Sequence, residues 1–565
     1  MSVKKSKKRD AAASRHARPG GPSAGLLLAA FLAAAFVIYA PALNGTFISD
    51  DEHYVQRNVF VHHPIENWVA IWDPTSVLAE IVENYAPVHV LLHAVEWQLF
   101  GNRTFGYHAV NVALHALASL FLVLLLRRSG VSGTASALGG AFFLVHAANV
   151  EAVAWINQLK TSSAMVLCLG ALLAHPRRAP LGAVLFGLAL LAKPTAAVAL
   201  FVAAAAGWAR TGKQEPRSGR PSSDAGDVDW RWIWLGGWAL FLALFAVAEF
   251  AAFLQTAGQA PALYDGFGDR TRSILAIALR YLVMAGSSYG LSTFHEPAPA
   301  GLLDPWWLAS LPVLAALGWR TVVALRDRKE EAGWWLFAIV SFAPVCGIIP
   351  LPFPIADRYL YFILPGLIGG VLLAGPELIA RLRPAASAGL WRGLRIAAAV
   401  LIVLLAVRSF DRASVWQTPF TAMGDSIANY PDGVAAKTHH ATAAAQAGDA
   451  GTAVALLEAA HERGYNRLDH LLMPGYARIQ GDAAFEALKR EWAREWIERL
   501  TQKKRPSQHE LQVVAQAQLV LNDLEAARAT IVQAIEVGGP ISENLRADLD
   551  EVERAIRFSR LREAR

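Results

Sequence analysis

Long apolar segments alternate with short polar loops over the first 408 residues of the chain, and most segments contain few charged residues. An α-helix needs about 20 apolar residues to cross the ~30 Å hydrocarbon core of a bilayer. The pattern therefore predicts an all-α, polytopic membrane protein with about eleven transmembrane helices. The predicted spans are 24–43, 107–126, 131–147, 161–175, 179–193, 194–209, 232–253, 305–325, 333–350, 360–380 and 391–408.

Two other stretches do not fit simple crossings. Residues 44–106 contain short amphipathic pieces and are predicted to be an outer loop with interfacial helices. Residues 273–294 are apolar, but counting them as a crossing would invert every later basic loop. We therefore interpret 273–294 as a re-entrant or interfacial helix.

Basic residues set the orientation of these spans. Residues 1–23 form a basic tail, which favours a cytoplasmic flank over a nucleic-acid-binding arm. With the N-terminus inside, the basic loops all fall in the cytoplasm, as does the polar linker 211–229. These loop residues are Arg127, Arg128, Arg177, Arg178, Arg210, Lys213, Arg217, Arg220, Arg326, Arg328, Lys329, Arg381, Arg383, Arg392 and Arg395.

Composition agrees with a membrane protein. Hydrophobic residues make up 54% of the chain and charged residues 17%, against roughly 25% charged in soluble domains. Cys168 and Cys346 both fall in apolar spans, which argues against a structural disulfide or a cysteine metal site. The first span could be read as a cleaved signal peptide, but its length favours an uncleaved helix.

Residues 409–565 are polar, alanine-rich and helical in period, and the topology places them outside the membrane. Four positions recur at a constant offset of 74 residues: Asp449, Ala453, Ala460 and Gly464 match Asp523, Ala527, Ala534 and Gly538. This offset is close to twice ~34 residues, so it predicts a tetratricopeptide-like domain of paired helices. A plain helical bundle is the alternative.

The candidate chemistry begins with the acidic run Asp50-Asp51-Glu52, just beyond the first span. Carboxylates at a membrane edge carry a free-energy cost unless they are paired, solvated or functional. Asp50 or Asp51 could act as a general base on an acceptor hydroxyl while a lipid-linked donor loses its phosphate. The bland alternative is that one of them caps a helix starting near Glu52.

Cations of other segments fall on the same predicted face. Lys160, Lys193 and Arg358 could bind the donor phosphate, with His146, Glu151 and Asp357 nearby. Alternatively, the lysines could extend to lipid headgroups, and Arg358 could only pair with Asp357 or Glu151.

His89, His93 and Glu96 have i, i+4, i+7 spacing, and a divalent metal is the one cofactor this pattern admits. A polar stripe on an interfacial helix is the more ordinary interpretation. His108, Asn111 and His115 share a face of the second span and predict interhelical hydrogen bonds.

Several motifs are similar to those of one known family. They are Tyr85-Ala86-Pro87, Trp97-Gln98-Leu99-Phe100-Gly101, the run Gly106 to Ala116, His146 with Val150 to Ile156 and Lys160, Ala192-Lys193-Pro194, and Ala356-Asp357-Arg358-Tyr359-Leu360-Tyr361. Their order, followed by helical repeats, resembles bacterial relatives of the transmembrane and tetratricopeptide repeat containing O-mannosyltransferases.

The resemblance implies a GT-C fold and a polyprenyl-phosphate sugar donor used on the non-cytoplasmic face. It places the catalytic carboxylate at Asp50 or Asp51 and implies supporting roles for Tyr85 and Tyr359. The chain departs from eukaryotic members in having Ala86 in place of Arg, Ala147 in place of Pro, and Pro194 in place of Glu. Mannose is the sugar expected from relatives, and nothing in the sequence selects it.

The sequence thus predicts a glycosyltransferase of a bacterial inner membrane, with a cytoplasmic N-terminus and a periplasmic repeat domain at 409–565. The expected partners are a polyprenyl-phosphate sugar, a protein or peptide acceptor held by the repeats, and membrane lipid, without nucleic acid. The alternatives are a non-catalytic scaffold for envelope assembly and a lipid-linked glycan transporter or ligase. A transporter would carry polar residues deep in several spans, and this chain has few there.

Overall fold

The computed structural model describes residues 22–82, 84–211, 230–256, 266–348, 353–383, 388–501, 503, 506–538 and 541–563. Within these ranges the chain forms helices joined by turns, with no β-strand. The fold is therefore that of an all-α protein, as predicted. The basic tail 1–23 and the linker 211–229 lie almost entirely outside the described residues.

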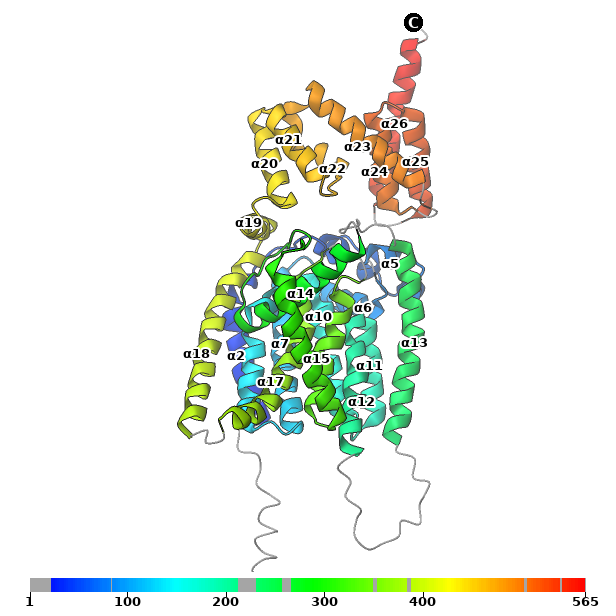
Figure 1. Ribbon diagram of the computed structural model, residues 1–565. Helices are drawn as coiled ribbons and strands as arrows, with labels where there is room; N and C mark the ends of the chain where they lie inside the picture. The colour runs from blue at the N-terminus through cyan, green and yellow to red at the C-terminus, as the bar shows by residue number, and fades with distance from the viewer. Residues whose placement is uncertain are drawn as a thin grey trace, which may run out of the picture.

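An apolar bundle occupies the first part of the chain, with its long helices side by side (Figure 1). Six helical stretches are long and apolar enough to cross a bilayer, and a seventh counts if the bent pair around Val145 is one span. The long bundle helices are α7 (Thr104–Arg128), α10 (Leu159–Ala174), α13 (Trp230–Thr256), α15 (Pro305–Arg326), α17 (Leu360–Leu382) and α18 (Ala388–Ala413). The bent pair consists of α8 (Gly133–Leu144) and η3 with α9 (Ala147–Ala154), at an angle of 50°.

Four of the eleven predicted spans are apolar helices below that length. They are α2 (Ala24–Ile38), α11 (Ala179–Ala192), α12 (Val198–Thr211) and α16 (Glu331–Phe342). A helix of 14 residues, such as α11, is about 21 Å long at 1.5 Å per residue. Proline-containing turns follow or precede these helices, at Pro41, Pro194 and Pro344. That these four also cross the membrane stays a prediction.

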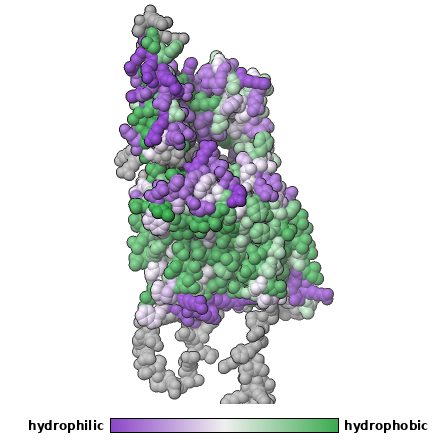
Figure 2. All heavy atoms as spheres, turned by 180° about the vertical axis from the view of Figure 1, so that it is seen from behind, coloured by the Kyte–Doolittle hydropathy of each residue, from purple (hydrophilic) through white to green (hydrophobic). Residues whose placement is uncertain are grey.

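The outer surface of the bundle is apolar where lipid would surround it. Figure 2 shows a continuous hydrophobic belt between two polar zones. Only 6% of the most apolar 18-residue stretch of α18 is buried inside the protein, and only 17% of the corresponding stretch of α13. Exposed side chains such as Leu240, Val247 and Leu404 cover these faces. This distribution defines a polytopic membrane protein, because soluble proteins do not expose apolar surfaces of this extent to water.

Residues 44–106 form short helices at the bundle end nearer the C-terminal helices (Figure 1). They are η2 (Glu52–Gln56), α3 (Val59–His62), α4 (Trp68–Trp72), α5 (Val77–Ile81) and α6 (Pro87–Phe100). The helix predicted at 273–294 overlaps α14 (Phe267–Ser287), which ends seven residues earlier and is not among the helices apolar enough to span.

The C-terminal helices form a separate layer over that end of the bundle (Figure 1). They are α19 (Pro419–Asn429), α20 (Val434–Ala447), α21 (Ala450–His461), α22 (Leu468–Leu471), α23 (Ala483–Thr501), α24 (Gln508–Val520), α25 (Leu524–Val537) and α26 (Ser542–Glu563). Two buried clusters, one around Leu457 and Trp492 and one around Ile531 and Leu545, give this layer cores of its own.

The 74-residue offset corresponds to two helix hairpins, α20–α21 and α24–α25. Asp449 and Asp523 are the N-caps of α21 and α25, and their side chains accept from the backbone N–H groups of Thr452 and Ala526. Just before each cap the backbone is left-handed, at Gly448 (φ 86°) and Asn522 (φ 63°). The equivalence of the hairpins is thus visible in the fold, whereas their assignment to the tetratricopeptide class stays a prediction.

Candidate functional site

The site lies in irregular turns at the bundle end that faces the C-terminal layer. The loop before η2 is joined to the start of that layer, because Thr46 N donates to Gln417 O at 2.8 Å. Trp155 and Trp416 stack there with their ring centroids 5.5 Å apart. Residues 145–158 break the helical path at this level and are buried throughout. The polar side chains of the site therefore come from backbone turns at this end of the helix bundle.

Asp50 and Asp51 have different environments. Asp51 is fully buried, and its two oxygens accept hydrogen bonds from Ile48 N at 2.8 Å and Asn157 N at 2.7 Å. Burial raises the pKa of Asp51 well above its usual range, although both hydrogen bonds oppose that shift. Asp51 thus fastens the acidic loop to the turn after Trp155. Its side chain makes no helix-cap hydrogen bond to η2, contrary to the capping alternative.

Asp50 is partly exposed, and its Oδ1 accepts from the hydroxyl of Ser49 at 3.1 Å. Ser49 has a left-handed backbone (φ 52°), which turns the chain just before the acidic pair. Asp50 also interacts electrostatically with the guanidinium of Arg358. Of the two carboxylates, only Asp50 has a side chain that an incoming hydroxyl could reach.

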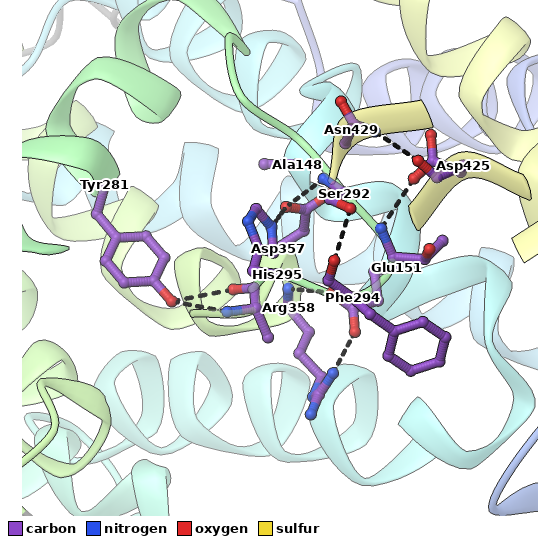
Figure 3. A network of polar contacts seen from close by, with 12 residues as sticks. Ala148, Glu151, Tyr281, Ser292, Phe294, His295, Asp357, Arg358, Asp425 and Asn429 are labelled. Carbon is purple, nitrogen blue, oxygen red and sulfur yellow. Dashed lines mark hydrogen bonds and ion pairs between the residues drawn. The ribbon is translucent and has the colours of Figure 1, made fainter. Parts of the chain in front are cut away.

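Arg358 is held by Glu151, which is one of the two pairings the sequence left open. Glu151 Oε2 accepts from Arg358 N at 2.8 Å, and its Oε1 forms an ion pair with the Arg358 guanidinium (Figure 3). The rings of Trp155, Phe353 and Tyr359 lie 5.1–5.3 Å from the guanidinium carbon. The Arg358 side chain is 12% exposed, so the cation is fixed in place yet accessible.

Lys160 and Lys193 belong to the same group of charges. Lys193 Nζ donates to Thr161 Oγ1 at 2.6 Å, and Lys160 Nζ lies 4.7 Å from the ring centroid of Tyr54. Lys193 interacts electrostatically with Lys160, Arg358 and Glu151. Both ammonium groups therefore turn toward protein groups, where the alternative had them extending to lipid headgroups. Together with Asp50, Glu151 and Arg358, these two lysines form a group that we call the charged cluster.

The residues expected to support the site have structural partners. His146 Nε2 lies 3.1 Å from Ala285 O. Tyr85 N donates to Glu249 Oε2 at 2.9 Å, and Tyr85 Oη donates to Trp72 O at 3.0 Å. The ring of Tyr359 packs beside Arg358.

Asp357 faces away from the charged cluster, toward the C-terminal layer. His295 Nε2 lies 2.8 Å from its Oδ1, and Arg412 Nη2 lies 2.9 Å from its Oδ2 (Figure 3). Arg412 also pairs with Asp425 of α19 at 3.1 Å. Sequence reasoning missed His295, Arg412 and Asp425. The signal for Arg412 was weak, because a basic residue at a helix end is usually a membrane flank.

The candidate metal residues on α6 form a local contact. His93 Nδ1 lies 2.7 Å from Glu96 Oε2, and the rings of His89 and His93 are 4.5 Å apart. Burial lowers the pKa of His89, as do the nearby charges of Lys160 and Lys193. Over the described part of the chain, no group of three or more His, Cys, Asp or Glu is arranged to hold a metal ion.

Two of the three polar residues predicted to bond between helices, Asn111 and His115, do so, whereas both ring nitrogens of His108 are buried without a hydrogen-bond partner among the described residues. Asn111 Nδ2 donates to Trp155 O at 3.2 Å, and its Oδ1 accepts from Ser162 Oγ at 2.9 Å. His115 Nδ1 lies 2.9 Å from Tyr361 Oη. These bonds brace the turns that carry Trp155 and Glu151.

A comparison with curated proteins finds a distant partial relative. The Protein O-mannosyl-transferase Tmtc1 of Drosophila melanogaster is 34% identical over 131 residues, which is 22% of this chain and 15% of that protein. The match thus spans less than a quarter of either sequence. No family model matches the chain, and no solved structure matches it.

Proposed function

We propose that the protein is a membrane glycosyltransferase of GT-C type, which moves a sugar from a polyprenyl-phosphate donor to a protein hydroxyl. The observation that carries the proposal is the charged cluster, in which the partly exposed carboxylate of Asp50 interacts with the Arg358 guanidinium, and Lys193 interacts with both Arg358 and Lys160. The partial similarity to an O-mannosyl-transferase supports the same reaction class and suggests mannose as the sugar.

In the proposed reaction, the acceptor oxygen attacks the anomeric carbon as the bond from that carbon to the phosphate oxygen breaks. Asp50 takes the hydroxyl proton. The donor leaves as polyprenyl phosphate, and Arg358, Lys160 and Lys193 stabilise its negative charge. Asp51 is a positioning residue, because its oxygens are occupied by backbone N–H groups.

The proposed setting is a bacterial inner membrane with the N-terminus in the cytoplasm. The charged cluster and the C-terminal layer would then face the periplasm, where the helix hairpins would hold the acceptor. Extended helical-repeat arrays form concave surfaces of this kind.

The test is transfer by the full-length protein, reconstituted in liposomes with a panel of polyprenyl-phosphate sugars and an acceptor peptide mixture. Asp50→Asn is expected to lower transfer by about 10²- to 10⁴-fold, the usual contribution of a general base. Glu52→Gln is the matched control, since Glu52 lies two residues away and pairs with Arg57. Transfer at the wild-type rate by Asp50→Asn would remove Asp50 as the base, and no turnover of any donor would favour the scaffold.

A further inference from the structure

A cavity lies within the C-terminal layer, between α24, α25 and α26. It encloses about 290 Å³, and all of its lining residues belong to these three helices. The layer covers the same end of the bundle as the charged cluster (Figure 1). The α24–α26 cavity is therefore separate from the proposed catalytic site but lies on the side of the membrane where an acceptor would be held.

The floor of this cavity is apolar. Ile531 of α25 and Leu545 and Val552 of α26 are buried lining residues, and they belong to the core cluster that joins the three helices. Leu519 and Ala555 extend the apolar lining to the surface, where both are exposed. A ligand would gain stability by placing aliphatic carbon against this floor, because apolar area would leave water.

Two carboxylates give the cavity a negative charge. Asp548 is partly buried and Glu551 is exposed, and both line the cavity from adjacent turns of α26. Burial raises the pKa of Asp548, and so does the nearby charge of Glu551. Among the described residues, no Lys, Arg or His lines the cavity, so these two negative charges are not balanced within it. A cation between the two carboxylates would relieve their repulsion.

Neighbouring carboxylates of α25 and α26 are balanced differently. Glu553 accepts from Arg528 Nε at 3.0 Å, and Glu525 pairs with Arg560 at 2.5 Å. Asp548 and Glu551, by contrast, form no ion pair within the part of the chain that the structure describes. The carboxylates that line the cavity are therefore available to a cationic ligand.

A side-chain amide adds a further acceptor on the opposite wall. Gln516 of α24 lines the cavity, and its Oε1 has no hydrogen-bond donor among the described residues. Rotation about the last side-chain torsion, which has a broad energy profile in glutamine, would turn this oxygen into the cavity. Carboxylates and an amide oxygen accept hydrogen bonds, whereas a lysine ammonium or an arginine guanidinium only donates them. The polar lining therefore matches a basic side chain.

We propose that the α24–α26 cavity binds a lysine or arginine side chain of a polypeptide segment, which is the acceptor if the proposed function holds. Such a side chain has an aliphatic stem that ends in a cation. The stem would lie on Ile531 and Val552 while the charged group meets Asp548 and Glu551. Leu519, exposed beside the cavity, offers an apolar contact to residues that flank the bound side chain. The segment recognised is therefore basic, with an apolar residue close to the cation.

The test selects a phage-displayed library of random short peptides on the purified full-length protein in nanodiscs, without any sugar donor. We expect the selected peptides to be enriched in Lys or Arg beside an apolar residue. The most enriched peptide should bind the double variant Asp548→Asn/Glu551→Gln about 3- to 30-fold more weakly, the effect of losing two partly exposed charge pairs. The control Glu543→Gln/Asp550→Asn removes two exposed carboxylates of α26 that do not line the cavity, and it should bind like wild type.

A third variant, Ala555→Trp, places a bulky ring at the exposed edge of the cavity without changing its charge. Weaker peptide binding to Ala555→Trp supports a ligand that enters the cavity, as opposed to one attracted by the charge of the layer. Selected peptides without Lys or Arg, equal weakening in the control pair, or full binding to Ala555→Trp would overturn the proposal. Specific peptide binding by a protein that transfers no sugar would support the cavity and contradict the proposed function alone.

Discussion

Asp50 and Asp51 are neighbours in sequence, yet the structure gives them opposite environments. Asp51 has no exposed surface and both of its oxygens are bound to backbone N–H groups, whereas Asp50 is partly exposed beside Arg358. One carboxylate therefore holds the loop in place, and the other is available for chemistry. This division makes different predictions for the two residues.

Asp51→Asn should destabilise the protein by about 1–3 kcal/mol, because the amide NH₂ would leave one buried N–H donor of Ile48 or Asn157 without an acceptor. Thermal unfolding can be followed with a thiol-reactive dye, since Cys168 and Cys346 are buried and react only on unfolding. Asp50→Asn is the matched control, and its melting temperature should stay near that of wild type. Equal melting temperatures for all three proteins would contradict the anchoring role of Asp51.

The same residue predicts a pH dependence of stability. Burial raises the pKa of Asp51 above its ordinary value of 3.8, so the folded protein binds this proton more tightly than the unfolded chain. That contribution is complete below pH 3.8 and is lost as the pH rises through the elevated pKa. The stability advantage of wild type over Asp51→Asn should therefore shrink as the pH is raised from about 4, and then level off. The melting temperatures of both proteins between pH 4 and pH 8 check this, and a widening difference would contradict it.

At the residue scale the sequence named candidate site residues, but it did not distinguish the roles that their environments suggest. The sequence left open whether Arg358 pairs with Asp357 or with Glu151, and in the structure it pairs with Glu151. It could not separate Asp50 from Asp51, because the deciding partner, Asn157, lies 106 residues away. Hydrogen bonds to backbone groups that are distant in sequence leave no local pattern.

At the scale of elements, one arginine links α18 and α19 directly to the site. Arg412 ends α18 and bridges the buried Asp357, next to Arg358, with Asp425 of α19. Glu296 strengthens the same junction, since its carboxylate accepts from the first backbone N–H groups of α20, Val434 and Ala435. The C-terminal layer is therefore attached through side chains that also define the site.

Arg412→Met should destabilise this junction by about 3–5 kcal/mol, because the buried Asp357 and its neighbour Asp425 would both lose their shared arginine. Limited proteolysis of the full chain measures the effect, and cleavage between α18 and α20 should become faster. Arg408→Gln is the control, since Arg408 is exposed one turn earlier on α18. Equal cleavage rates in Arg412→Met and Arg408→Gln would show that the bridge does not hold the layer.

Elements were predicted well where their signal is periodic. Each of the eleven apolar segments contains a helix within the described residues, and the 74-residue offset located two hairpins with equivalent N-caps. Their lengths were predicted less well, because proline turns end some of them early: α2 stops at Ile38, before Pro41, although the apolar run continues to Leu43. Hydrophobicity alone does not distinguish a helix from the apolar turn that follows it.

At the scale of the whole molecule, the hydrophobic belt separates two polar ends with different contents. One end carries the charged cluster and the C-terminal layer, and the other carries the last turns of α7, α12 and α15, with Arg128, Arg210 and Arg326. These are opposite ends of the same helix bundle. The positive-inside rule predicts which end faces the cytoplasm, and the proposed donor and acceptor sites both depend on that orientation.

Single-cysteine labelling in intact cells tests the orientation directly. In a background with Cys168→Ser and Cys346→Ser, Glu458→Cys places a thiol on an exposed position of α21, and Arg326→Cys places one at the exposed end of α15. A maleimide that cannot cross the inner membrane should label Glu458→Cys in intact cells and Arg326→Cys only after permeabilisation. The cysteine-free parent, which should stay unlabelled, is the control. The reverse pattern would place the charged cluster in the cytoplasm, where a periplasmic acceptor could not reach Asp50.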